Sequence, residues 1–140
     1  MDNSSTNVSL KNCPVSALKV RTVVDLLRGE SVAYALSALK YHSKKNISEY
    51  LSKLVKAGIA SWKEKYTSAN EIDIKCLYIS EIAVNQGSYV KRMRAASRGR
   101  VHRIKRPYSH ILLTIKNRST AVEVNDSANT LVSVDNKKEK

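Results

Sequence analysis

The sequence predicts an α+β fold, in which three helices pack on a small antiparallel sheet and a long β-hairpin protrudes from the body. Apolar residues recur at helical spacing in three segments before residue 67, and from residue 72 the period changes to two. The strongly basic stretch 91–106 then separates the first long strand from a second one over residues 109–116. Because the chain has 140 residues, we expect one domain, to which we assign residues 1–116.

The segment before the first glycine contains a short strand and the first helix. Val8 and Leu10 alternate with polar neighbours, which indicates a short edge strand. Ser16 has the right chemistry to cap the helix that follows. The apolar face of that helix obeys the i, i+3, i+4, i+7 rule and consists of Val20, Val23, Val24 and Leu27. Gly29 is expected to end the helix in the left-handed conformation.

Two further helices are expected before residue 67. The second begins near Ser31, repeats the same apolar spacing and ends at a polar connector over residues 41–45. The third begins with Asn46 and Glu49, which resemble a capping box, and ends near Tyr66. Its apolar stripe consists of Ile47, Tyr50, Leu51, Leu54, Val55, Gly58, Ile59 and Trp62.

Two residues on this stripe have alternative interpretations. Gly58 indicates either close approach of another backbone or a glycine that is simply tolerated in a helix. Trp62 could stack on a nucleic-acid base, as aromatic side chains do in single-stranded RNA recognition. Because Trp62 continues the apolar stripe, we favour a place in the core.

The second half of the domain is predicted to form two long strands. The apolar face of the first strand consists of Ile72, Ile74, Cys76, Tyr78, Ile82 and Val84, and Ser80 interrupts it. Residues 85–88 indicate a bend or bulge, and Pro107 interrupts the chain before the returning strand. We expect the protruding hairpin over about residues 86–106. An arm of about ten residues at ~3.3 Å each reaches ~30 Å from the body.

The basic stretch 91–106 is the most informative part of the sequence. It carries eight basic side chains and no acidic one: Lys91, Arg92, Arg94, Arg98, Arg100, Arg103, Lys105 and Arg106. Such unpaired charges repel one another, and a polyanion relieves the repulsion. Gly99 supplies the positive φ of a chain reversal. With a net charge of +13, RNA binding is favoured over the alternative of a solvated basic loop.

Several other classes of chemistry are not expected. The sequence has no glycine-rich phosphate motif, and His42, His102 and His110 lie at no metal-ligating spacing. Cys13 and Cys76 form no Cys-x-x-Cys pair, and Cys76 is expected to pack as a small hydrophobe. We therefore expect no enzyme, metal, cofactor or small-molecule substrate. No apolar run approaches the ~20 residues that span a bilayer, and we expect a cytoplasmic protein without a membrane partner.

An ordered set of short motifs resembles a known family. The motifs are Ser-x-x-Lys-Val-Arg at 16–21, Val-Asp-Leu-Leu-Arg-Gly at 24–29, Lys-Arg at 91–92, Arg-Gly-Arg at 98–100, Arg-Ile at 103–104 and Ser-His-Ile at 109–111. Over about residues 7–116 the chain strongly resembles ribosomal protein 22 of the L series from the large subunit, in its bacterial form. The resemblance implies three helices on a sheet and a long hairpin that lines the nascent-peptide exit tunnel. It also implies binding to large-subunit ribosomal RNA, contacts with neighbouring proteins and the growing polypeptide, a role in assembly, and a link to macrolide sensitivity.

The resemblance and the basic stretch together assign residues to these roles. The expected RNA-binding residues are Lys19, Arg21, Arg28, Lys91, Arg92, Arg94, Arg98, Arg100, His102, Arg103, Lys105 and Arg106. The expected tunnel-lining tip consists of Ala95, Ala96, Ser97, Arg98, Gly99 and Arg100. Many family members have Pro-Arg where this chain has Ala95-Ala96, so the hairpin is expected to be less stiff there.

The sequence also leaves rival interpretations and one unassigned segment. Two short helices joined through Gly29 could form a helix-turn-helix-like DNA-binding regulator. The concentration of charge in the strand region disfavours that alternative. A protein-interaction or membrane-surface module is a third class, although the narrow apolar stripes are sufficient for only one core. Residues 117–140 are polar, carry both signs of charge and are expected to form a mostly disordered tail.

Overall fold

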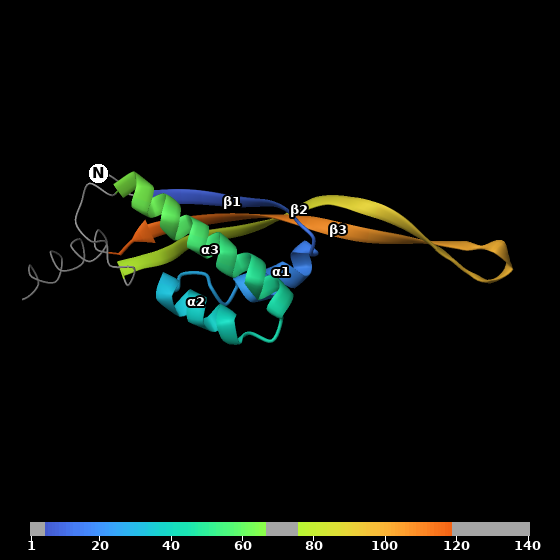
Figure 1. The fold of residues 1–140 in the computed structure, drawn as a ribbon, viewed down its shortest axis with the longest axis horizontal. Coiled ribbons are helices and arrows are strands. Elements are labelled where there is room, and N and C mark those ends of the chain that lie inside the picture. Colours follow the sequence, from blue (N-terminus) through green and yellow to red (C-terminus); the bar gives the residue numbers. More distant parts are fainter. Residues whose placement is uncertain (1–4, 67–75, 119–140) are drawn as a thin grey trace, which may run out of the picture.

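The computed structural model describes residues 5–66 and 76–118 of the chain. Its elements are β1 (Ser5–Cys13), α1 (Ala17–Val24), α2 (Val32–Tyr41), α3 (Lys45–Tyr66), β2 (Leu77–Ala95), the short 3-10 turn η2 (Ser97–Gly99) and β3 (Val101–Asn117). The helices pack beside a three-stranded antiparallel sheet, and β2 and β3 continue far beyond them as a hairpin (Figure 1). The predicted α+β class with a protruding hairpin is confirmed.

The sheet has the order β1-β3-β2, so β3 is its central strand. β1 is the edge strand expected near residues 8–10. Its buried residues are Thr6, which lies opposite Ile115, and Cys13 at its end. Along β3, the side chains of Ile111, Leu113 and Ile115 face the helices and are 0–1% exposed. One apolar core therefore lies between this face of the sheet and the three helices.

The residues of β2 that face the core differ in part from those predicted, because the pairing with β3 shifts between Ile79 and Glu81. Ser80 is the additional residue of this bulge. Before it, the side chains of Leu77 and Ile79 face the core, and after it the even-numbered Ile82 and Val84 do. A bulge moves all following side chains by one place relative to the partner strand.

The predicted inward orientation of Cys76 and Tyr78 is consequently wrong. Cys76 is exposed and Tyr78 is half-buried, whereas Cys13 at the end of β1 is the buried thiol. The prediction for residues 72–75 lies outside the described residues.

Two helix boundaries also differ from prediction. α1 ends at Val24, because the N–H groups of Leu26 and Leu27 bond three residues back, to Val23 and Val24, in a tight turn. Gly29 follows this turn with a φ of +81°, so its predicted left-handed conformation is confirmed.

At the start of α3 the predicted capping box is wrong. The helix already begins at Lys45, so Asn46 lies inside it. The side chain of Glu49 bonds Lys53 at 2.7 Å and not the backbone of Asn46. The cap predicted at Ser16 is also wrong, because its side chain makes no capping hydrogen bond. The second helix begins beside Ser31 as expected, and there the Ser31 hydroxyl accepts the N–H of Tyr34 at 3.3 Å.

The apolar stripe of α3 packs closely against the centre of the sheet. A Cβ on Gly58 would lie 2.5 Å from Cδ1 of Ile115, so this glycine makes room for a side chain of the sheet and not, as one of its two interpretations had it, for another backbone. Trp62 is 1% exposed, and its ring lies 4.5 Å from that of Tyr66. Trp62 is therefore a core residue, as favoured, and is not available to stack on a base.

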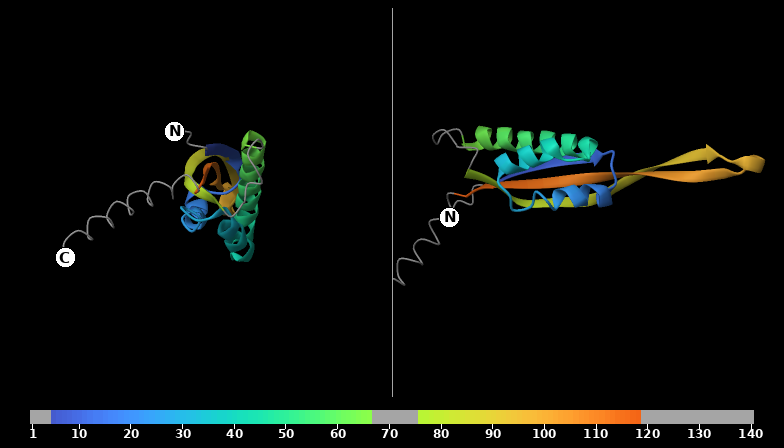
Figure 2. Two further views of the ribbon diagram at one scale, coloured as in Figure 1. Left: turned by 90° about the vertical axis from the view of Figure 1, so that its left-hand side faces the viewer. Right: turned by 90° about the horizontal axis from the view of Figure 1, so that it is seen from below.

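The hairpin is a continuation of the sheet without a second layer. Figure 2 shows β2 and β3 leaving the body as a twisted ribbon that no helix covers. The register of β2 shifts once more between Gln86 and Tyr89, which confirms the predicted bulge near residues 85–88. Pro107 lies opposite Tyr89 inside β3 and does not interrupt the strand. A proline beside a bulge is tolerated because the ladder there lacks a regular hydrogen bond.

Candidate nucleic-acid interface

The strand pairing places two like charges opposite each other on the hairpin. Lys91 is paired with Lys105, and Arg94 lies opposite the imidazole of His102. Directly opposed residues of an antiparallel pair project from the same face at about 4.5–5.5 Å between Cβ atoms, where like charges destabilise the pairing. No acidic residue occurs between Glu81 and Glu123 in the sequence. The hairpin therefore carries uncompensated positive charge that an external anion would neutralise.

Both faces of the hairpin carry this charge. Side chains alternate along each strand, so Lys91, Arg103 and Lys105 lie on one face. The opposite face holds Arg92, Arg94, His102 and Arg106. All seven side chains are exposed. A protein that docks one side of a ribbon on a surface needs charge on that side only, whereas this hairpin is suited to being surrounded by anionic groups.

Apolar side chains are interspersed with the basic ones. Met93 is 78% exposed, Val101 is 53% exposed and Ile104 is 38% exposed. The ammonium of Lys105 lies 5.3 Å from the ring centroid of Tyr89, a cation–π contact on the first face. We did not single out these residues from the sequence, although the alternation of apolar and basic residues over 89–105 was a detectable signal. They leave apolar surface exposed between the charged groups.

The tip reverses the chain through two consecutive left-handed residues. Arg98 has a φ of +57° and Gly99 a φ of +68°. The turn is closed by the N–H of Ala96, which donates to the carbonyl of Arg100 at 2.8 Å. Of the predicted tip, only Ala96 is partly buried, and the side chains of Arg98 and Arg100 are exposed. The tip thus presents two guanidinium groups at the far end of the ribbon.

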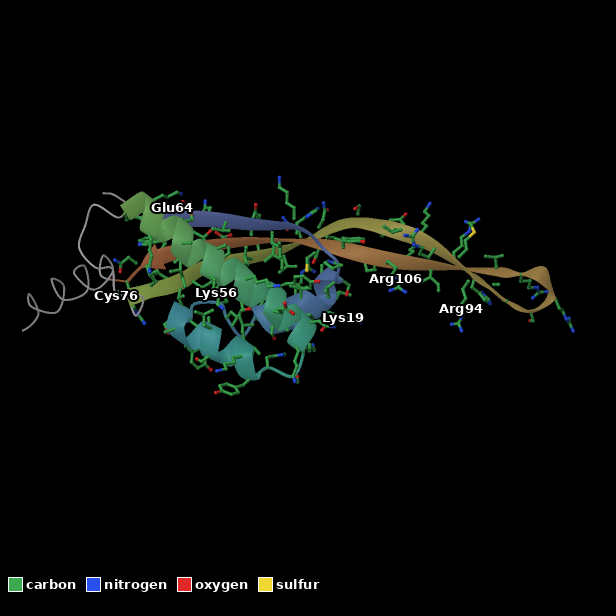
Figure 3. The ribbon with its side chains drawn as sticks, viewed as in Figure 1. Lys19, Lys56, Glu64, Cys76, Arg94 and Arg106 are labelled. Carbon is green, nitrogen blue, oxygen red and sulfur yellow. The ribbon has the colours of Figure 1, made fainter. Side chains whose placement is uncertain are left out.

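The three basic residues predicted near the first helix are separated by the structure. Arg21 donates through Nη2 and Nε to the carbonyl of Val84, at 2.9 and 3.3 Å. Arg28 donates to the carbonyl of Ile82 and to Asp25, both at 3.4 Å. Arg21 holds α1, and Arg28 holds the turn after it, against the outer edge of β2, and both residues remain exposed. Lys19 lies instead at the end of the body from which the hairpin emerges, on the same side as Arg106 (Figure 3).

Other functional chemistry is sparse in the described parts of the chain. Within residues 5–66 and 76–118 no group of three or more His, Cys, Asp or Glu side chains is placed to hold a metal ion. Burial raises the pKa of the Cys13 thiol, which disfavours a reactive thiolate at that position. None of the described helices has the length and apolar character that a membrane span requires.

Comparison with known proteins identifies the family. The family model of Ribosomal protein L22p/L17e matches residues 8–116, which is most of the chain. The chain belongs to this family. The matched range includes the whole hairpin and all three helices. Members of the L22p/L17e family are structural ribosomal proteins and not enzymes, in agreement with the sequence-based prediction.

Relatives within the L22p/L17e family come from several bacteria. A protein of Christiangramia forsetii is 44% identical over 106 residues, covering 76% of this chain and 77% of the relative. A protein of Flavobacterium johnsoniae is 39% identical over the same length, with 76% of each chain covered. One from Bacteroides fragilis is 34% identical over 116 residues, or 83% of each chain. All three are named large ribosomal subunit protein uL22.

Proposed function

We propose that this chain is a structural component of the large ribosomal subunit, that it binds large-subunit ribosomal RNA and that its hairpin lines the nascent-peptide exit tunnel. The observation that carries the proposal is the hairpin with basic side chains on both faces and with Lys91 paired with Lys105 across its strands. The chain's relatives are named as large-subunit proteins, which supports the same assignment. Its location is accordingly the ribosome in the cytoplasm.

Electrostatics are the main source of affinity in this proposal. Ordered RNA phosphates would neutralise the eight basic residues of 91–106 and release counterions. If all eight contact phosphates, the log–log dependence of affinity on salt has a slope of about −6. Specificity comes mainly from the shape of the folded RNA, because phosphate contacts position a protein and carry little sequence information.

The tip residues Arg98 to Arg100 have a separate role. A hairpin surrounded by RNA along its arms can present its end to a channel between RNA walls. We assign the exposed tip to the wall of the exit tunnel, where it contacts the growing polypeptide. The body remains on the outer side of the subunit and contacts neighbouring proteins, and the protein supports assembly by holding separate RNA segments together.

A DNA-binding regulator fits the structure less well. A helix-turn-helix places its second helix in the major groove, with basic or polar side chains toward the bases. The candidate second helix, α2, has the sequence VAYALSALKY with Lys40 as its single basic residue. The charge lies instead on β2 and β3.

Fractionation of cells on a sucrose gradient tests the proposal, with the protein quantified by mass spectrometry against known large-subunit proteins. We expect stoichiometric amounts in the large-subunit and polysome fractions, retained after a moderate salt wash. Recovery only at the top of the gradient, or on chromosomal DNA, would refute the proposal. In a second measurement, crosslinking of stalled nascent chains to a photoreactive group at position 98 is expected only if the tip lies in the tunnel.

A further inference from the structure

An open groove of about 1010 Å³ lies where the hairpin leaves the body. Three segments that are distant in the sequence line it: the start of α1, the connector between α2 and α3, and the base of β3. Five basic residues border the groove and no acidic residue does. They are Lys19, Lys44, Lys45, Lys105 and Arg106. Such a concentration of one sign in a concave site focuses the field on a bound anion.

The residues of the α2–α3 connector are held in place by the body. The ammonium of Lys44 donates to the hydroxyl of Thr22 at 2.7 Å, and that hydroxyl donates to the carbonyl of Lys19 at 2.9 Å. The N–H of Lys44 donates to Nδ1 of His42 at 3.0 Å. These hydrogen bonds link Lys44 to α1, the helix that carries Lys19, so the two lysines border the groove from adjoining segments. From the sequence, residues 41–45 are expected only to form a polar connector.

A serine hydroxyl, two helix N-termini and several apolar side chains also line the groove. Ser16 precedes α1, but its side chain makes no capping hydrogen bond, so its hydroxyl is available in the groove. The first turns of α1 and α3 both border the groove, and their dipoles add to the positive field. Val15, Ile47 and Pro107 supply apolar surface between the charged groups. Alternating charge and apolar surface matches the alternation of phosphate and ribose along a nucleic-acid strand.

We propose that this groove binds a segment of RNA backbone, and that it clamps one strand between the body and the base of the hairpin. The inference rests on the proposed function, because Lys105 and Arg106 belong to the groove and to the hairpin arm alike. A polyanion that follows the arm toward the body therefore enters the groove directly. This continuity favours RNA over an acidic protein segment as the occupant. The clamp would set the angle of the hairpin relative to the RNA that the body contacts.

The test compares two pairs of substitutions in the full chain, with a large-subunit rRNA transcript as probe. The groove variant carries Lys44→Gln and Lys45→Gln. The control carries Lys56→Gln and Lys65→Gln, which remove the same charge from exposed positions of α3 outside the groove. We expect the groove variant to lose about tenfold in affinity at moderate salt, and its salt slope to become shallower by about 1 to 2 units. The control is expected to change affinity less than twofold.

Hydroxyl-radical footprinting locates the contact. The groove variant is expected to lose protection of a short run of RNA backbone that Arg98→Gln with Arg100→Gln leaves protected. Equal affinity of groove variant and control would overturn the groove assignment while the proposed function stands. A groove variant that binds RNA normally but fails to retain a neighbouring protein in assembled subunits would overturn it in favour of a protein partner. If the unmodified chain does not bind large-subunit rRNA, the proposed function itself fails.

Discussion

The body and the hairpin are built from the same two strands but are stabilised in different ways. In the body, β2 and β3 face helices across an apolar core. The ion pairs between described residues, Arg28–Asp25 and Lys53–Glu49, lie on the surface of the body and not on the hairpin. In the hairpin the same strands have no second layer and carry charge of one sign. An isolated two-stranded hairpin is marginally stable in water. The body is stabilised by an apolar core, whereas the hairpin is held by the pairing of its two strands alone.

The largest expected effect compares two positions on β3. Leu113 is 1% exposed within the body, and Ile104 is 38% exposed on the hairpin. Leu113→Ala is expected to lower the free energy of unfolding by about 2–5 kcal/mol, because it leaves a cavity. Ile104→Ala should change it by less than about 0.5 kcal/mol. Urea denaturation of both variants measures the difference, and similar losses would mean that the hairpin folds as part of the core.

A smaller effect is expected at the boundary between the two regions. Arg21→Ala removes the guanidinium that bonds the carbonyl of Val84 on the outer edge of β2. The expected loss of stability is about 1–2 kcal/mol, as for a hydrogen bond from a charged group. Arg21→Lys is the control, since one ammonium can restore part of the bond. If Arg21→Ala melts like the unmodified protein but binds rRNA more weakly, Arg21 acts on RNA and not on the fold.

The charges at the tip should affect binding and not folding. Replacing Arg98 and Arg100 by Ala is expected to reduce affinity for large-subunit rRNA about tenfold, with a shallower salt slope. The free energy of unfolding should change by less than about 0.5 kcal/mol, because both side chains are exposed and outside the core. Thermal melting and RNA titration of the same preparation give both values. A large fall in stability would show that the tip supports the body.

The smallest effect concerns the exposed pair Glu49–Lys53 on α3, whose N···O distance is 2.7 Å. Hydrogen bonding to Lys53 lowers the pKa of Glu49. The pair therefore stabilises the folded state above the unfolded pKa of a glutamate, about 4.3, and this contribution is lost as the pH falls through the lower folded pKa. Melting temperatures of Lys53→Ala and the unmodified protein should differ slightly at pH 7 and converge near pH 3. A constant difference across this range would exclude the pair as its cause.

Much of the fold could be predicted because its signals are local. The apolar periods of the helices, the start of α2 beside Ser31 and the left-handed glycines at 29 and 99 depend on neighbouring residues only. The predictions that failed depend on partners elsewhere. The face of Cys76 was wrong because a bulge at Ser80 is set by the pairing with β3. The capping box of α3 was wrong because the helix already begins at Lys45 and Glu49 bonds Lys53, and the sequence pattern alone does not choose between that bond and a cap.

The interface shows the same division. By itself the sequence determined which residues over 91–106 are basic, how densely they follow one another and that they fall in one hairpin. It also determined the chain reversal at Gly99. Both depend on charge and backbone preference, which are properties of the residues themselves. Only the tertiary structure decided that Lys91 faces Lys105, that Arg21 is bound to the edge of β2, and that Lys44 and Lys45 share a groove with Arg106. Strand register and packing decide which residues meet, even across the 63 positions that separate Arg21 from Val84, and no local rule specifies these partners.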